Sequence, residues 1–136
     1  MNVNRFSPDE LKNICLHDKI IGTIQFDRLM KKMIIPIMPE NEHDTDNTIH
    51  EMIFSNVLGY EITTCDFWCP SPHIFSFSFL SKEEERLIPK YYKKWCAQND
   101  SFHTPENFPG AKSFEVLFEF TSGDTLSIAC EELFWE

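Results

Sequence analysis

Two runs of alternating apolar residues late in the chain constrain the fold more than any other feature. Residues 114–120 read Phe-Glu-Val-Leu-Phe-Glu-Phe, residues 125–131 read Thr-Leu-Ser-Ile-Ala-Cys-Glu, and Thr-Ser-Gly-Asp lies between them. An apolar period of two predicts strands, and a short connection that contains Gly predicts an antiparallel hairpin. The segment therefore indicates a protein built on antiparallel sheet.

The same residues predict the register of this hairpin. Its apolar face comprises Phe114, Val116, Phe118, Phe120, Leu126, Ile128 and Cys130. A three-residue loop over 122–124 keeps these residues on one face, with Phe120 opposite Leu126. This register sets Glu115 opposite Glu131, and like charges so placed cost about 0.2–1 kcal/mol. Either water or a Lys on a neighbouring strand relieves this repulsion, or the two carboxylates form a site for a cationic group of a partner.

The remaining elements follow from periodicity and from turn residues. We expect a short helix from Ser7 to about Ile14, strands over 19–26, 33–38, 50–54, 58–67 and 74–79, and a helical segment over about 82–98. Pro36 favours an edge strand or a bulge, and Pro89 favours a kinked or divided helix. Strands, a helix and then strands indicate a single α+β domain over 1–136, mainly antiparallel β-sheet.

The charge balance limits the class of partner. The formal net charge is −10, which opposes binding to nucleic acid or to anionic membranes and favours a cationic protein. The five cysteines are an odd set without repeated spacing, which favours reduced thiols. No signal peptide and no membrane span is predicted, so we expect a cytoplasmic protein.

The acidic residues are segregated along the sequence. Residues 40–66 carry seven Asp or Glu and no Lys or Arg, and residues 100–136 carry eight against a single Lys. If both stretches lie on one sheet, its open face steers cationic proteins toward it. The candidate partner-binding residues are Glu42, Asp44, Asp46, Glu115, Glu119 and Glu131.

The motifs of catalytic and metal sites are absent or incomplete. His17 and Asp18 are adjacent, and neighbours on a strand point to opposite faces, so we expect a turn-forming Asp beside a partly buried His rather than a catalytic dyad. Cys65, Cys69 and His73 lack a matching second ligand pair for zinc. The run Asp44-Thr45-Asp46-Asn47 departs from the calcium-loop pattern. We therefore predict no catalytic residue, no metal and no cofactor.

A resemblance points in the same direction. Three features resemble those of small bacterial proteins: the run Leu16-His17-Asp18-Lys19-Ile20-Ile21 before a predicted hairpin, the segment Phe67-Trp68-Cys69-Pro70-Ser71-Pro72, and the late hairpin. Some of those proteins are uncharacterised, and others are immunity proteins encoded beside polymorphic toxins. Their second segment reads F-W-G-x-S-P, and Cys69 replaces the Gly here. The resemblance implies a cytoplasmic α+β or mainly β domain and no particular functional residue.

Three functional hypotheses result. The first is a non-enzymatic acidic binding protein of the immunity type, which neutralises a basic, nuclease-like toxin. The second is a housekeeping or regulatory module, with a homodimer through an apolar sheet edge as one form. The third is an enzyme that uses carboxylates, which requires a deep pocket with convergent acids.

Overall fold

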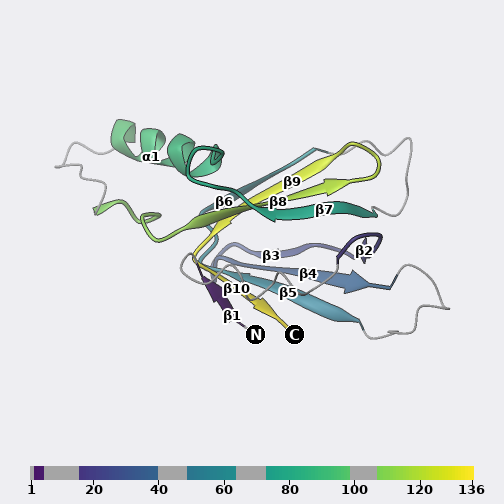
Figure 1. The fold of residues 1–136 in the computed structure, drawn as a ribbon. Helices are drawn as coiled ribbons and strands as arrows, with labels where there is room; N and C mark the ends of the chain where they lie inside the picture. The colour runs from purple at the N-terminus through teal and green to yellow at the C-terminus, as the bar shows by residue number, and fades with distance from the viewer. Residues whose placement is uncertain (1, 5–15, 40–48, 64–72, 99–106) are drawn as a thin grey trace.

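The computed structural model describes residues 2–4, 16–39, 49–63, 73–98 and 107–136 (Figure 1). These residues form two antiparallel sheets, packed as layers, and one helix on the outer side of the second sheet. The expected mainly antiparallel β-sheet with a helical segment is therefore confirmed. The helix expected at residues 7–14 lies outside the described residues.

The first sheet, sheet A, has the strand order β1-β10-β5-β4-β2, and β3 also pairs with β4. Its strands are β1 (Asn2–Asn4), β2 (Ile20–Ile21), β3 (Gln25–Asp27), β4 (Lys32–Met38), β5 (His50–Ser55) and β10 (Glu132–Trp135). The second sheet, sheet B, has the order β6-β9-β8-β7. Its strands are β6 (Gly59–Ile62), β7 (Ile74–Phe79), β8 (Phe114–Phe120) and β9 (Thr125–Cys130), and α1 spans Leu87–Gln98.

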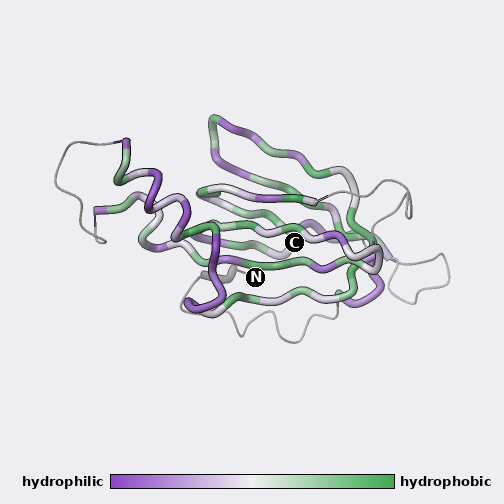
Figure 2. The backbone as a smooth tube through the Cα atoms, turned by 90° about the horizontal axis from the view of Figure 1, so that it is seen from above, coloured by the Kyte–Doolittle hydropathy of each residue, from purple (hydrophilic) through white to green (hydrophobic). Residues whose placement is uncertain are grey.

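The core lies between the two sheets and is formed by alternate residues of each strand. Met33, Ile35 and Ile37 of β4 are buried, as are the even-numbered residues 114–130 that the sequence assigned to one face. The rings of Phe54 and Phe118 meet edge to face across the layers, with centroids 6.5 Å apart. Figure 2 shows the strands as largely hydrophobic traces, whereas hydrophilic residues are frequent along α1.

Backbone hydrogen bonds continue close to the places where the chain changes sheets, and at one end of the sandwich they join the two sheets. At the end where the chain passes twice from sheet to sheet, Leu58 N donates to Ala129 O at 2.8 Å, which extends the β6–β9 pairing of sheet B. At the other end Asp18 N donates to Ile74 O, and Ile74 N donates to Lys19 O, both at 2.8 Å. Few described backbone N–H and C=O groups therefore lack a hydrogen-bond partner where the chain passes from one sheet to the other.

Pro36 does not mark an edge strand, because β4 pairs with β5 on one side and with β2 and β3 on the other. The irregularity that Pro36 predicts occurs in the neighbouring strand instead. β2 ends at Ile21 and β3 begins at Gln25, and Gly22 N donates to Pro36 O between them. Pro36 has no backbone N–H to donate to a continuous partner strand. The strand beside it is therefore interrupted between β2 and β3.

The register of the β8–β9 hairpin differs from the prediction by two residues. Glu115 lies opposite Ala129, and Phe118 lies opposite Leu126. The predicted pairing of Glu115 with Glu131 is therefore wrong, although the apolar face is correct, because a shift of two residues preserves the face of every side chain.

A loop one residue earlier than expected causes the shift. Phe120 N donates to Asp124 O, and Gly123 N donates to Phe120 O, so the loop comprises Thr121–Gly123. Gly123 has φ +92°, the left-handed conformation that ends a three-residue hairpin loop. The alternation of apolar residues does not by itself locate the loop. The position of the left-handed residue, Gly123, determines which three residues form it.

Two further differences concern the ends of elements. The helix begins at Leu87 rather than near residue 82, which places Pro89 in its first turn, where no intrahelical partner exists for a backbone N–H. The prediction that Pro89 kinks or divides the helix is therefore wrong. β10 was not predicted: it follows the hairpin, crosses to sheet A, and pairs with β1 and β5.

α1 lies across one end of the outer face of sheet B (Figure 1). Gly59 provides the closest approach, since the position of a Cβ there is occupied by the ring and hydroxyl of Tyr91. Lys90 Nζ lies 2.6 Å from Glu61 Oε1, and this contact lowers the pKa of Glu61 and raises the pKa of Lys90. Among the described residues, no helix is long and apolar enough to cross a membrane.

Gly59→Ala should destabilise the protein by about 1–3 kcal/mol, because the new methyl group displaces Tyr91 and with it α1. In the Tyr91→Ala background the same change should cost much less. Urea denaturation of the four proteins of this double-mutant cycle measures both values. Equal costs in the two backgrounds would show that Tyr91 is not the obstacle.

Candidate functional site

Glu115 is a buried structural residue rather than part of an open acidic face. Its side chain is only 1% exposed. The carboxylate accepts hydrogen bonds from Ile88 N at 2.6 Å and from Arg86 N at 3.1 Å, at the start of α1. An acceptor with negative charge is favourable there, because the first backbone N–H groups of a helix lack intrahelical partners.

Local sequence signals do not provide this cap. Ser81 and Glu84 have the spacing of a capping box at the start of the expected helical segment, and Glu84 does accept hydrogen bonds from Ser81 N and Ser81 Oγ. These hydrogen bonds lower the pKa of Glu84. They stabilise an isolated turn over 82–84, however, and α1 begins three residues later. The residue that caps α1 comes from β8, so only the tertiary fold brings it there.

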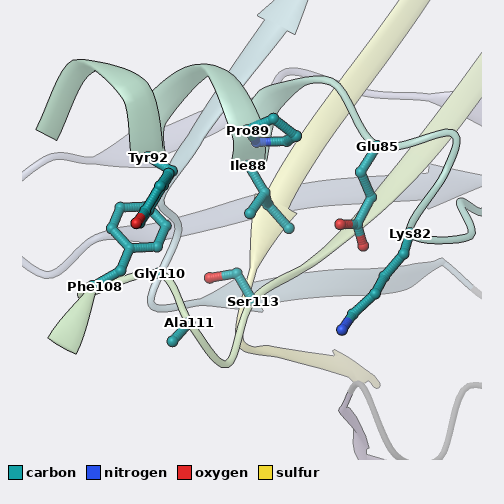
Figure 3. Close-up of a pocket in the computed structure, with 9 residues that line it drawn as sticks. All are labelled: Lys82, Glu85, Ile88, Pro89, Tyr92, Phe108, Gly110, Ala111 and Ser113. Carbon is teal, nitrogen blue, oxygen red and sulfur yellow. The ribbon is translucent and has the colours of Figure 1, made fainter. Parts of the chain in front are cut away.

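Beside the capped end of α1 lies a cavity of about 350 Å³ (Figure 3). It is lined by the start of α1, the turn before it and the segment that leads into β8, namely by Lys82, Glu85, Ile88, Pro89, Tyr92, Phe108, Gly110, Ala111 and Ser113. We call it the α1 pocket. Its volume lies within the range of sites that hold small molecules or single anchor side chains.

The α1 pocket has an apolar end and a charged end. Tyr92 and Phe108 meet edge to face, with ring centroids 5.3 Å apart, and lie at one side of Ile88 in Figure 3. Lys82 and Glu85 lie at the other side. This arrangement suits an apolar group joined to a charged one. No local sequence pattern predicts this pocket, because its walls come from three separate segments.

The other candidate acids are not brought together. Glu119 is exposed on the outer face of β8, opposite Thr125. Glu131 lies where the chain leaves sheet B, and its Oε2 accepts a hydrogen bond from Asn56 Nδ2 at 3.3 Å. Glu119 lies opposite Thr125, and Glu131 follows Thr125 by six residues. At the rise of a strand, the two acids are therefore about 20 Å apart. Glu42, Asp44 and Asp46 lie outside the described residues.

A pair of like charges does occur, but on sheet A. Glu51 N donates to Glu136 O at 2.9 Å and Glu136 N donates to Glu51 O at 3.0 Å, so the two residues lie directly opposite each other. Both side chains are exposed, and their neighbours Met52 and Trp135 face the core. Neither residue is among the predicted site residues, because the pairing of these two segments was not expected from the sequence.

His17 and Asp18 also correct an expectation. They lie in a turn, where Asp18 has φ +66°, and His17 Nε2 is 3.4 Å from Asp18 Oδ2. The expected turn at Asp18 is confirmed, whereas the expectation that the two side chains point apart is wrong, because it assumed a strand. His17 Nδ1 lies 2.9 Å from Phe75 O, so this imidazole links the turn to β7. Both side chains are about half exposed.

Nothing in the described part of the chain forms a group of three or more His, Cys, Asp or Glu that could hold a metal ion. Cys130 is buried, and burial raises the pKa of its thiol, which makes it unreactive. Cys65 and Cys69 lie outside the described residues.

Comparison with known proteins does not place the chain in a family. No protein-family model matches it, and no curated protein matches it. The functional argument therefore depends on the chain's own residues.

Glu115→Ala should destabilise the protein by about 3 kcal/mol, because it leaves two backbone donors at the start of α1 without an acceptor. Glu115→Gln should cost less, since it retains an acceptor oxygen. The control is Glu119→Ala, an exposed change on the same strand that should stay within about 0.5 kcal/mol. Urea denaturation gives the stabilities, and hydrogen exchange should locate the loss of protection at residues 86–90.

Proposed function

We propose that the chain is a non-enzymatic acidic binding protein of the immunity type, which masks a basic, nuclease-like toxin in the cytoplasm. The net charge of −10 supports a cationic partner, because it accelerates association with such a protein and opposes association with polyanions. The sequence resemblance to immunity proteins supports the same class of partner.

The observation that carries this proposal is the Glu51–Glu136 pair. Two backbone hydrogen bonds hold the residues opposite each other, and in such a pair the Cα atoms lie about 5.5 Å apart. Like charges directly opposite destabilise a sheet. A Lys or Arg of a partner that contacts both carboxylates relieves this repulsion, so part of the cost is recovered in the complex.

The enzyme hypothesis finds less support in the described residues. A carboxylate-dependent site needs at least two acids that converge on a pocket. Only Glu85 among the described acids lines the α1 pocket, and Glu115 is occupied by backbone donors.

A regulatory module that binds a small ligand is the second candidate. The α1 pocket favours it, because an apolar end and a charged end together select amphipathic molecules. A screen by thermal shift with small apolar carboxylates and amines tests this role. Stabilisation that Tyr92→Ala abolishes would support it.

Glu51→Gln should affect the free protein and the complex in opposite directions. It should stabilise the free protein by about 0.2–1 kcal/mol, because it removes the like-charge pair. It should weaken binding to the toxin encoded beside this gene, since it removes half of the site for the toxin's cation. Urea denaturation and calorimetric titration at low and high salt measure the two effects.

Glu119→Gln is the matched control, because it removes the same charge from an exposed strand position opposite the neutral Thr125. It should change neither stability nor binding appreciably. Equal weakening by both variants would attribute binding to net charge alone. If the protein does not bind the toxin encoded beside its gene, the immunity role is excluded.

A further inference from the structure

A buried hydroxyl group lines the α1 pocket and has no hydrogen-bond partner among the described residues. It belongs to Ser113, which is 6% exposed and whose backbone N–H donates to Gly110 O at 3.0 Å. Buried hydroxyl groups are normally hydrogen-bonded, because burial without a partner is unfavourable. The Ser113 hydroxyl is therefore suited to bind a polar atom of a ligand.

The position of Ser113 gives the pocket an order of chemical groups. In Figure 3 this residue lies between the aromatic side chains of Tyr92 and Phe108 on one side and Lys82 on the other. Its hydroxyl oxygen points toward the aromatic side. The pocket thus presents an apolar end, then a hydroxyl group, then a cation.

The lysine at the charged end selects the sign of the ligand. Lys82 is exposed and forms no ion pair with any residue that the structure describes. Glu85, by contrast, already makes an interaction within the chain. A single lysine matches the one charge of a carboxylate, whereas a phosphate group carries nearly two. The charged end therefore favours a carboxylate over both a phosphate and an amine.

The net charge of the chain does not oppose a carboxylate at this place. Residues 82–98 carry five Lys or Arg and three Glu, and Lys112 directly precedes Ser113. Exposed charges further away than the Debye length, about 10 Å at 0.1 M salt, are largely screened. The sign of the potential at the pocket therefore depends on these local groups, in which cations are in excess.

The pocket is formed before a ligand binds. Glu115 accepts hydrogen bonds from Arg86 N and Ile88 N and so holds the start of α1. On the opposite wall, Ala111 N donates to Phe108 O at 3.0 Å, and the side chain of Phe108 is buried. A preformed site loses little conformational entropy when it is occupied, which favours binding.

We propose that the α1 pocket binds a small aromatic carboxylate that carries a hydrogen-bonding group between its ring and its carboxylate. The ring packs on Tyr92 and Phe108. The middle group forms a hydrogen bond with Ser113 Oγ, and the carboxylate pairs with Lys82 Nζ. A cavity of about 350 Å³ accommodates a molecule of this size.

This ligand class rests on the small-ligand role given above as the second candidate function. It does not involve the toxin-binding pair of carboxylates on sheet A, so the two roles are tested separately.

N-benzoylglycine is a suitable probe, because it carries a ring, an amide and a carboxylate in the required order. Three analogues of similar length are matched controls: N-benzoylglycinamide lacks the charge, γ-phenylbutyrate lacks the amide, and N-benzoylethylenediamine reverses the charge. NMR titration of the isotope-labelled protein should give a dissociation constant of about 1 mM or lower for N-benzoylglycine. Each analogue should bind about two- to tenfold more weakly.

Two variants assign the polar contacts. Ser113→Ala should weaken binding of N-benzoylglycine by about three- to tenfold and leave binding of γ-phenylbutyrate unchanged. Lys82→Ala should weaken binding of N-benzoylglycine by about two- to fivefold and leave binding of N-benzoylglycinamide unchanged. Lys94→Ala makes the same charge change at an exposed position of α1 outside the pocket and should alter neither.

The stability of the unliganded protein separates ligand binding from a structural role of Ser113. Because the hydroxyl has no partner to lose, Ser113→Ala should leave the midpoint of urea denaturation unchanged or raise it. The same variant should weaken binding, so the two effects do not share a cause. A lowered midpoint would assign the hydroxyl to the folded core and overturn its role as a ligand contact.

Two results of the titration would also overturn the proposal. The first is N-benzoylglycine that binds no better than its neutral and cationic analogues. The second is a set of ligand-induced shifts that lies outside residues 82–92 and 108–113. If compounds of the thermal-shift screen still stabilise the protein in either case, the ligand class is wrong and the small-ligand role remains. If none does, both fail.

Discussion

The hydrogen bonds from the first turn of α1 to the Glu115 carboxylate hold the α1 end of this molecule together. Glu115 is one of the few buried polar residues of sheet B, and it accepts the Arg86 and Ile88 N–H groups that a helix start leaves without partners. The capped helix in turn places Tyr91 on Gly59 and forms one wall of the α1 pocket. The only helix in the described residues therefore depends on the carboxylate of Glu115. From the sequence alone, this carboxylate looks like a surface charge.

Charge in this protein is arranged locally rather than over one large acidic face. The described acids divide among different tasks: Glu115 caps α1, Glu61 pairs with Lys90, and Glu51 faces Glu136 across sheet A. Three exposed cations, Arg28, Lys31 and Lys32, lie together at the turn between β3 and β4. Net charge states which kind of partner the whole chain attracts, but the position of each contact depends on such local groups.

The predictions that succeeded depend on short-range patterns. Alternation assigned the apolar faces of β8 and β9, because the two-residue period of a strand acts over a few neighbouring residues. The predictions that failed depend on distant partners. The hairpin register followed from the left-handed Gly123, and the start of α1 followed from a strand 27 residues further along the chain. The interruption beside Pro36 appeared in the partner strand rather than in its own.

By itself the sequence determined an acidic, mainly antiparallel β-sheet protein with a known apolar face in its late hairpin. These properties follow from composition and from the two-residue period of strands, which require no knowledge of neighbours in space. Only the tertiary structure decided that Glu115 is buried, that Glu51 faces Glu136, and that Ile88, Tyr92 and Phe108 share a pocket. Each of these juxtapositions joins segments far apart in the chain, and the pairing of distant strands, which no local pattern encodes, brings them together.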